Sequence, residues 1–245
     1  MKLLGLIGYP LSHSFSKKYF SDKFETLNIA DKWKYELFPI ENIKFLPEIL
    51  VRHPELVGLN VTIPYKEQVI PFLNSLDSDA EKIGAVNCIA VENGKLKGFN
   101  TDIIGFGESL KALIGGEKNL EALVLGTGGA AKGVEFVLRQ RQIPFKYVSR
   151  NKIKDYLTYD DLTPEVMQKY RLIINTTPLG MSPHTETFPP ILYEQLTEHH
   201  FLYDLVYNPT ETLFLKRGAQ YSAKVKNGLD MLHIQAEAGW KIWNS

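Results

Sequence analysis

The first hundred residues alternate between patterns typical of strands and patterns typical of helices. Apolar residues form short runs or alternate at period two over 2–7, 35–40 and 57–63, which predicts three strands. Apolar residues at helical spacing predict helices over 16–27, 43–51 and 66–76. Two further strand-like runs, 85–91 and 95–99, flank Asn93-Gly94, a strong hairpin signal. Such alternation favours a mostly parallel sheet covered by helices on both faces.

The alternation restarts in the second part of the chain. A helix is predicted over 103–114 and ends at Gly115-Gly116. The strands predicted after it span 120–125, 146–148, 172–175, 201–205 and 223–226, and helices are predicted over 133–141, 212–218 and 231–243. We therefore expect an α/β protein with one domain over residues 1–101 and another over 102–245, whose last helix, 230–245, returns to pack against the first domain.

Polar side chains gather near the ends of the strands predicted in the first domain. In Val57–Lys66 (VGLNVTIPYK), Asn60 and Thr62 alternate with apolar residues, and Lys66 follows the strand. The other polar residues at strand or loop ends are Ser14, Ser16, Asn87, Asn100, Thr101 and Asp102. Together these residues predict a small polar pocket that suits a polyhydroxylated ligand. A lysine and an aspartate in one pocket can transfer protons when the carboxylate orients the ammonium.

Each of these residues also has a purely structural interpretation. Ser14 or Ser16 can cap the helix that follows, and Asp102 can be the N-cap of the helix predicted after it. Asn87 can be a buried amide whose hydrogen bonds are satisfied by its neighbours, and Lys66 can be an exposed first-turn residue. Both interpretations stay open for each residue taken singly.

A glycine-rich turn follows the first strand of the second domain. The buried run Leu123-Val124-Leu125 leads into Gly126-Thr127-Gly128-Gly129-Ala130-Ala131, which fits G-x-G-x-x-G/A and opens a helix. Gly126 permits the tight turn, Gly128 allows a pyrophosphate to approach closely, and Ala131 keeps the helix near the strand. The helix N-terminus offers free N–H groups to phosphates. We predict a dinucleotide site here; the alternative is a glycine-rich turn with no ligand.

The end of the next predicted strand indicates the kind of dinucleotide. NAD-binding units place an acid about 20 residues after the glycine motif, but Ser149-Arg150-Asn151 stands there. The Arg150 guanidinium suits a 2′-phosphate, which favours NADP. Alternatively, Arg150 is a solvated surface residue, and Asp155 or another group selects the cofactor. Thr176 lies in the loop 175–181 after a later strand, and this loop is a candidate to flank the nicotinamide ribose. Alternatively, the loop is only a turn made rigid by proline and glycine.

Composition and charge narrow the possible partners. The chain has 245 residues with 28 basic and 28 acidic side chains, so it has no net charge, and no long basic run occurs. This balance argues against binding to nucleic acid. No apolar run reaches the ~20 residues of a membrane helix, and the single cysteine, Cys88, fits a reducing compartment. We expect a cytoplasmic protein, monomeric or homodimeric, with a small-molecule ligand and no membrane or nucleic-acid partner. We expect no metal, because the histidines lack ligand spacing.

Several motifs occur in one order along the whole chain and together resemble those of shikimate dehydrogenases. They are GYPLSHSFS, NVTIPYK, GAVN, GFNTD, GTGGAAKG, NTTPLGM, DLVYNPTET and NGLDMLHIQA. Members of this family reduce 3-dehydroshikimate with NADPH in aromatic amino-acid biosynthesis. The resemblance implies an N-terminal substrate-binding and catalytic domain with a mostly parallel sheet, followed by a C-terminal Rossmann domain that binds NADP. It also implies that Lys66 and Asp102 are the catalytic pair.

The resemblance further implies which side chains contact the ligands. Its substrate-contacting positions correspond to Ser14, Ser16, Asn60, Thr62, Asn87, Thr101, Tyr207 and Gln235. Its cofactor-contacting positions correspond to Gly126, Thr127, Gly128, Gly129, Ala130, Ser149, Arg150, Asn151, Thr176, Leu205, Gly228 and Met231. The chain departs from the family at Ser149, where Asn is common, and at Asn151, where Thr is common. The missing Thr hydroxyl is expected to weaken the preference for NADP. The alternatives are a quinate/shikimate dehydrogenase that uses NAD and a non-catalytic ligand-binding protein with the same fold.

Overall fold

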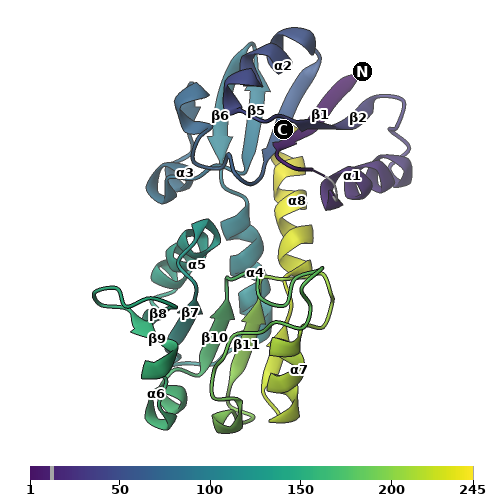
Figure 1. The fold of residues 1–245 in the computed structure, drawn as a ribbon. Coiled ribbons are helices and arrows are strands. Elements are labelled where there is room, and N and C mark those ends of the chain that lie inside the picture. Colours follow the sequence, from purple (N-terminus) through teal and green to yellow (C-terminus); the bar gives the residue numbers. More distant parts are fainter. Residues whose placement is uncertain (12–13, 245) are drawn as a thin grey trace. The chain divides into compact units, whose positions relative to one another are not determined.

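The computed structural model describes residues 1–11 and 14–244, which form two compact units with one β-sheet each (Figure 1). The first unit contains Met1–Thr101 together with the residues from Ala236 on, and the second contains Asp102–Gln235. Residues 12 and 13 of the motif GYPLSHSFS, and residue 245 at the end of the predicted last helix, lie outside the described residues. The α/β class predicted from the sequence is confirmed.

The sheet of the first unit has six strands in the order β2-β1-β3-β5-β6-β4. The strands are β1 (Lys2–Gly8), β2 (Trp33–Pro39), β3 (Leu56–Val61), β4 (Ser75–Leu76), β5 (Cys88–Glu92) and β6 (Lys95–Phe99). β1 runs parallel to β2 and β3, and β4 runs parallel to β6, whereas β5 is antiparallel to both of its neighbours. The sheet is therefore mostly parallel, as predicted. Asn93 and Gly94 connect β5 to β6 with positive φ at both positions, as a two-residue hairpin turn requires.

Helices cover both faces of this sheet. They are α1 (Phe15–Thr26), η1 (Ile43–Phe45), α2 (Leu46–Arg52), η2 (Ile70–Phe72), α3 (Ser78–Ile83) and the end of α8 (Leu229–Trp243). Successive residues of a strand face opposite sides, so β1 contributes Leu3 to one hydrophobic core and Leu4 to another. The first core contains α2, and the second contains α1 with the end of α8.

The last helix packs into the first unit through its aromatic residues. Trp240 and Trp243 are buried, and their rings contact Phe24 and Phe20 of α1. Trp243 also donates from Nε1 to the Ile89 carbonyl of β5 at 2.9 Å. α8 thus belongs to both units, since its residues up to Gln235 fall in the second and the later ones in the first.

The helix predicted over residues 66–76 is wrong. The segment forms turns over 66–69, then the 3-10 turn η2, then the short strand β4, which pairs with β6. Pro71 has no N–H with which to continue a helix. Asn74 accepts a hydrogen bond from the Leu96 N–H at 2.7 Å, which joins the segment to β6 instead. The apolar spacing nevertheless marked a core-facing residue correctly, because Val69 is fully buried.

The sheet of the second unit has six strands, all parallel, in the order β12-β11-β10-β7-β8-β9. The strands are β7 (Ala122–Leu125), β8 (Phe145–Ser149), β9 (Leu157–Thr158), β10 (Leu172–Asn175), β11 (Phe201–Asp204) and β12 (Lys224–Lys226). The helices are α4 (Asp102–Ile114), α5 (Gly129–Gln140), η3 (Tyr159–Asp161), α6 (Pro164–Lys169), η4 (Tyr193–Gln195), α7 (Leu213–Gln220) and the start of α8. The strand order reverses at β7, and ligands of such sheets bind at the carboxyl ends of the strands beside the reversal. This is the predicted Rossmann arrangement. Among the described helices, none is both long enough and apolar enough to span a membrane.

Candidate functional site

Asn60 and Asn87 connect two strands of the first unit. Asn60 lies near the end of β3, and Asn87 directly precedes β5, the antiparallel neighbour of β3. The Asn60 Nδ2 donates to the Asn87 carbonyl at 3.3 Å, and the same carbonyl accepts the Val61 N–H at 2.9 Å. Both asparagine side chains are buried, and the bond to the Asn87 carbonyl fixes the orientation of the Asn60 side chain.

Asn87 in turn fixes the end of the first unit. Its Oδ1 accepts the Thr101 N–H at 2.6 Å, and its Nδ2 donates to the Thr101 hydroxyl at 3.0 Å. Thr101 is completely buried, and Asp102 follows it as the first residue of α4. Three predicted site residues, Asn60, Asn87 and Thr101, are thus joined in one network, which we call the amide network. Asp102 is the first helical residue of α4 and not its N-cap, as its structural interpretation had it. The helix dipole favours a negative charge in the first turn, so a structural role at that position stays open.

Lys66 is placed by a turn that follows β3. The Tyr65 N–H donates to the Thr62 carbonyl at 2.9 Å, and the Tyr65 side chain is buried. The Lys66 carbonyl accepts the N–H of Val86, the residue before Asn87, at 2.7 Å. The Lys66 side chain is half-buried, not an exposed first-turn group of a helix. Its main chain is therefore held beside the amide network.

Ser14 and Ser16 lie at the start of α1. Ser14 is the N-cap residue, and its hydroxyl accepts the Lys17 N–H at 3.4 Å, which confirms its structural interpretation as a helix cap. Ser16 is the second residue of α1, and Tyr35 of β2 donates from its hydroxyl to Asn60 Oδ1 at 2.7 Å. Tyr35 therefore extends the amide network to β2. Our sequence analysis missed this residue, because an aromatic residue inside a predicted strand is usually a core residue.

Three other predicted substrate residues have different surroundings. Thr62 is half-buried just after β3, and its N–H donates to the Ile7 carbonyl at 3.0 Å. Tyr207 follows β11 in the second unit and is 37% exposed. Gln235 lies in α8, is buried, and donates from Nε2 to the Leu232 carbonyl at 3.0 Å.

The glycine-rich turn joins β7 to α5, as the motif predicts. Gly126 has a φ of 101°, in the left-handed region, and a side chain there would collide with the loop after β10. α5 begins at Gly129 with Gly128 as its N-cap residue, and Ala131 is buried. The N-terminus of α5 is therefore held at the carboxyl end of β7.

The other predicted cofactor residues lie at the same edge of this sheet. Leu125 at the end of β7 pairs with Val148 of β8 and Asn175 of β10, so the carboxyl ends of these strands are neighbours. The residues at or after the strand ends are Ser149, Arg150 and Asn151 (β8), Thr176 (β10), Leu205 (β11), and Gly228 and Met231 (β12 and the start of α8). A side chain at position 228 would collide with the Leu205 carbonyl, which accounts for the glycine.

Arg150 is exposed just beyond the end of β8. Burial raises the pKa of Tyr159, and the positive charge of Arg150 opposes that rise, so the guanidinium acts on this tyrosine. Ser149 is buried, and its hydroxyl accepts the Asn151 N–H at 3.3 Å. Exposure leaves Arg150 accessible to a phosphate, and it equally fits the alternative of a solvated surface residue.

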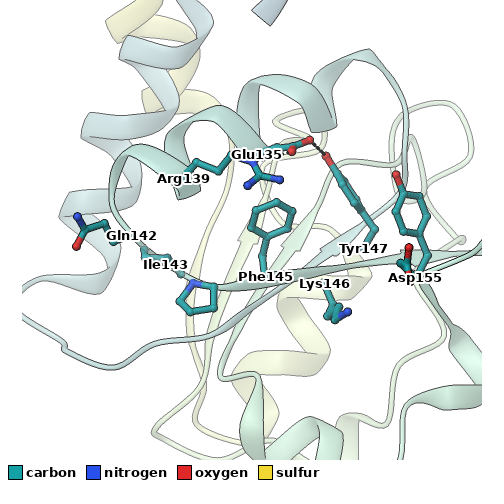
Figure 2. Close-up of a pocket in the computed structure, with 10 residues that line it drawn as sticks. Glu135, Arg139, Gln142, Ile143, Phe145, Lys146, Tyr147 and Asp155 are labelled. Atoms are coloured by element: carbon teal, nitrogen blue, oxygen red, sulfur yellow. Dashed lines mark hydrogen bonds and ion pairs between the residues drawn. The ribbon is translucent and has the colours of Figure 1, made fainter. Parts of the chain in front are cut away.

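Figure 2 shows a depression in the surface of the second unit, formed by α5 and β8. Glu135, Arg139, Phe145, Tyr147 and Asp155 belong to its lining. The Tyr147 hydroxyl donates to Glu135 Oε2 at 2.6 Å, and the Arg139 guanidinium lies over the Phe145 ring, 5.3 Å from its centroid. Among the described residues that line it, only Asp155 was considered for the cofactor, as the alternative to Arg150, and the glycine turn is absent from the lining, so we do not assign the cofactor to this depression.

Asp204, at the end of β11, is a buried carboxylate that our sequence analysis missed. It accepts hydrogen bonds from Thr212 Oγ1 at 2.6 Å, Asn175 Nδ2 at 2.9 Å and the Val206 N–H at 3.0 Å. It thus connects the start of α7 with the loops after β10 and β11, which carry predicted cofactor residues. Burial raises the pKa of Asp204 to about 6, and the three hydrogen bonds oppose this rise.

We expect Asp204 to make the stability of the protein depend on pH. Because its folded-state pKa of about 6 lies above the ordinary value of 3.8, the folded protein binds this proton more tightly than the unfolded chain. The resulting stabilisation is fully present below pH 3.8 and is lost as the pH rises through about 6. It should raise the free energy of unfolding by about 2 kcal/mol at about pH 4.5 relative to about pH 7.5. Urea unfolding of the Asp204→Asn variant should lack this difference; an unchanged pH dependence would contradict the role of Asp204.

The residues at the carboxyl edge of the second sheet fit a dinucleotide. Apart from the chain neighbours of each glycine and the nearby main chain of α5, no described atom lies within 4 Å of the point where a side chain would project from Gly128 or Gly129. A phosphate can therefore approach the main-chain N–H groups at the start of α5. Arg150 supplies the positive charge that suits a 2′-phosphate. The described residues contain no group of three or more His, Cys, Asp or Glu side chains that could hold a metal ion.

Comparison with known proteins finds relatives of the whole chain. The family profile described as "Shikimate dehydrogenase substrate binding domain" matches residues 6–89. The shikimate dehydrogenase (NADP(+)) of Methanococcus maripaludis is 37% identical, over 99% of this chain and 91% of its own length. That of Clostridium beijerinckii is 39% identical, over 99% of this chain and 92% of its own length.

The similarity in fold to solved structures also covers nearly the whole chain. The crystal structure of shikimate 5-dehydrogenase from Thermus thermophilus in complex with NADP(H) and shikimate matches with a TM-score of 0.84 and 31% identity. The match covers 99% of this chain and 93% of that one. Because sequence and fold agree over nearly the whole length of each relative, this chain belongs to the shikimate dehydrogenase family.

Proposed function

We propose that this protein catalyses the reversible, NADP-dependent reduction of 3-dehydroshikimate to shikimate, a step of aromatic amino-acid biosynthesis. The observation that carries the proposal is the amide network, which places buried amides and a hydroxyl beside Lys66 and directly before Asp102 in the chain. Such donors and acceptors suit the hydroxyl groups of a cyclic hydroxy acid. The similarity to shikimate dehydrogenases along the whole chain supports the same reaction.

Lys66 and Asp102 carry the acid–base chemistry in this proposal. Bound NADPH supplies a hydride to the C3 carbonyl carbon of the substrate. The Lys66 ammonium donates a proton to the carbonyl oxygen as negative charge develops there, and it is left as a neutral amine. In the oxidation of shikimate the neutral amine accepts that proton. The Asp102 carboxylate accepts hydrogen bonds from the substrate hydroxyls and so holds the reacting carbon in place.

Neutral donors bind the remaining groups of the substrate. We assign the ring carboxylate to the hydroxyls of Ser14 and Ser16, because they lie at the start of α1, where the helix dipole favours a negative charge. Asn60, Asn87 and Thr101 of the amide network face the substrate hydroxyls in this proposal. The other proposed substrate contacts are Thr62, Tyr207 and Gln235.

The carboxyl edge of the second sheet binds the cofactor in this proposal. The turn 126–130 and the N-terminus of α5 receive the pyrophosphate. Ser149, Arg150 and Asn151 receive the 2′-phosphate, and Thr176 lies on the nicotinamide side. The other proposed cofactor contacts are Leu205, Gly228 and Met231.

Replacement of Arg150 by alanine should weaken the use of NADP and leave the use of NAD nearly unchanged. A charge-assisted hydrogen bond contributes about 1.5–3 kcal/mol, so kcat/KM for NADP should fall about 10- to 100-fold. Steady-state kinetics with each cofactor at saturating shikimate measures the change. Lys152→Ala is a matched control, since it removes a nearby exposed cation that pairs with Asp161. Equal losses with NADP and NAD would show that Arg150 does not recognise the 2′-phosphate.

The direct test of the proposed function follows the absorbance of the reduced nicotinamide. Shikimate and quinate are each assayed with NADP and with NAD. We expect the highest kcat/KM with shikimate and NADP. Preference for quinate with NAD would replace the proposal by the quinate/shikimate dehydrogenase alternative. No reduction with any pair at high pH would leave a non-catalytic ligand-binding protein.

Three properties stay predictions from the sequence. We propose that the protein acts as a monomer or homodimer and that it binds neither nucleic acid nor membranes. We also propose a cytoplasmic location, for which the single cysteine, Cys88, gives the argument; its side chain is buried. Light scattering of the purified protein measures the oligomeric state.

A further inference from the structure

Asn100 carries a buried side chain that the proposed mechanism does not use. It lies directly after β6, and the residue is 7% exposed. Its Nδ2 donates to the Ala85 carbonyl at 3.0 Å. Among the described residues, none hydrogen-bonds its buried Oδ1. Because a buried acceptor without a partner costs stability, packing alone does not favour an asparagine here. What the position gains from the amide is the donor to Ala85.

The Ala85 carbonyl belongs to the same peptide group as the Val86 N–H. That N–H donates to the Lys66 carbonyl at 2.7 Å. A peptide group that does not precede proline is planar and trans, so its C=O and N–H point in opposite directions. This group therefore links Asn100 on one side to Lys66 on the other. Rotation of the group would weaken both hydrogen bonds, so the bond from Asn100 holds the hydrogen-bond partner of Lys66 in place.

Asn87, the next residue of the same loop, is held by other bonds. Its N–H donates to the Phe99 carbonyl at 3.0 Å, and its side-chain amide bonds Thr101. Loss of the Asn100 donor leaves these bonds in place. We therefore expect the effect of Asn100 at Lys66 rather than in the amide network.

We propose that Asn100 is a positioning residue for Lys66. Through the peptide group of Ala85 and Val86, it keeps the Lys66 main chain where the ammonium can reach the carbonyl oxygen of the substrate. Asp102 follows Asn100 by two residues, so the same side chain ties the Lys66 turn to the segment that leads into the second proposed catalytic residue. This inference rests on the proposed function.

The Asn100→Leu variant tests the positioning role, since leucine has a similar branched shape and no N–H. Because it removes the donor together with the Oδ1 that has no partner, we expect the variant to fold. Its kcat for shikimate should fall about tenfold, while the KM for NADP stays within about twofold. Asn100→Ala removes the same donor, should show the same loss, and replaces the leucine variant if that one does not fold.

The matched control is Asn74→Leu. It removes the hydrogen bond between another asparagine side chain of the first unit and the Leu96 N–H, and it should keep the wild-type kcat. An unchanged kcat in the Asn100 variants, or an equal loss of kcat in the control, would overturn the proposal.

A double-mutant cycle with Lys66→Ala shows whether Asn100 acts through Lys66. If it does, Asn100→Leu should lower kcat much less in the Lys66→Ala background than in the wild type. A merely structural role moves kcat by the same factor in both backgrounds, and that result would overturn the proposal.

Hydrogen exchange of the Val86 N–H tests the geometry without reference to activity. Its bond to Lys66 protects this N–H, so Asn100→Leu should make it exchange about tenfold faster, whereas Asn74→Leu should not. An unchanged exchange rate in Asn100→Leu would overturn the positioning role. A wild-type protein that does not oxidise shikimate would instead remove the proposed function, so the two failures are distinguishable.

Discussion

Lys66→Ala should lower kcat by about 10²- to 10⁴-fold while the KM for shikimate changes little. A positioned proton donor or acceptor contributes about this factor to the rate. The main chain of the turn is fixed by hydrogen bonds from Tyr65 to Thr62 and from Val86 to the Lys66 carbonyl. Truncation of the side chain should therefore leave the turn in place and remove only the proton transfer. Steady-state oxidation of shikimate with NADP measures both constants.

Two companion variants separate proton transfer from charge. Lys66→Arg keeps a positive charge, but a guanidinium does not give up its proton near neutral pH, so this variant should lose nearly as much activity. Lys82→Ala removes another lysine of the first unit, one that pairs with Asp79 on the surface, and it should keep the wild-type kcat. Full activity of Lys66→Ala or of Lys66→Arg would mean that Lys66 is not the proton donor.

The sequence predicts best those elements whose pattern is local and regular. The strands predicted over 95–99 and 172–175 coincide with β6 and β10 residue for residue. The glycine turn between β7 and α5 was equally predictable, because Gly126 has a positive φ and a side chain there would collide with Thr176 and Thr177. In these segments the neighbouring residues along the chain decide the conformation, so the local sequence is enough to predict it.

Short elements were missed for a physical reason. α3 and α6 have six residues each, which is too few to show helical periodicity. β4 and β9 have two residues each and exist only because β6 and β8 offer them hydrogen-bonding partners. Such partners lie far away along the chain, and the local pattern does not reveal them.

The sequence predicted which residues belong to the candidate site, but it did not predict which of them contact one another. Polar residues at strand ends singled out Asn60, Asn87 and Thr101, but only the fold shows that Asn87 bonds both of the others. Its main-chain carbonyl accepts from Asn60, and its side-chain amide bonds Thr101. Our sequence analysis missed Tyr35 and Asp204, because a tyrosine or an acid within a predicted strand commonly has a structural role. Their importance lies in partners from other strands and loops, which are separated from them in sequence.

Asp102→Asn should lower kcat for shikimate by about 10²-fold or more. The amide has nearly the same size, but it removes the negative charge and turns one hydrogen-bond acceptor into a donor. The structural interpretation of Asp102, as a first-turn residue of α4, expects a different result. It predicts only a loss of about 0.3–1 kcal/mol in stability, with kcat unchanged. Kinetics and urea unfolding of this variant, with Asp79→Asn as a surface control, therefore decide between the two interpretations.

The double variant Lys66→Ala, Asp102→Asn tests whether the two side chains serve one proton transfer. If they do, the loss of kcat caused by Lys66→Ala already includes most of what Asp102 contributes. The reason is that Asp102 cannot speed the reaction by orienting the substrate toward a proton donor that is missing. The double variant should then be only slightly slower than Lys66→Ala. If the roles are independent, the two losses multiply, and the double variant falls about 10²-fold below Lys66→Ala. The second outcome would remove the catalytic pair from the mechanism, even if each single variant were slow.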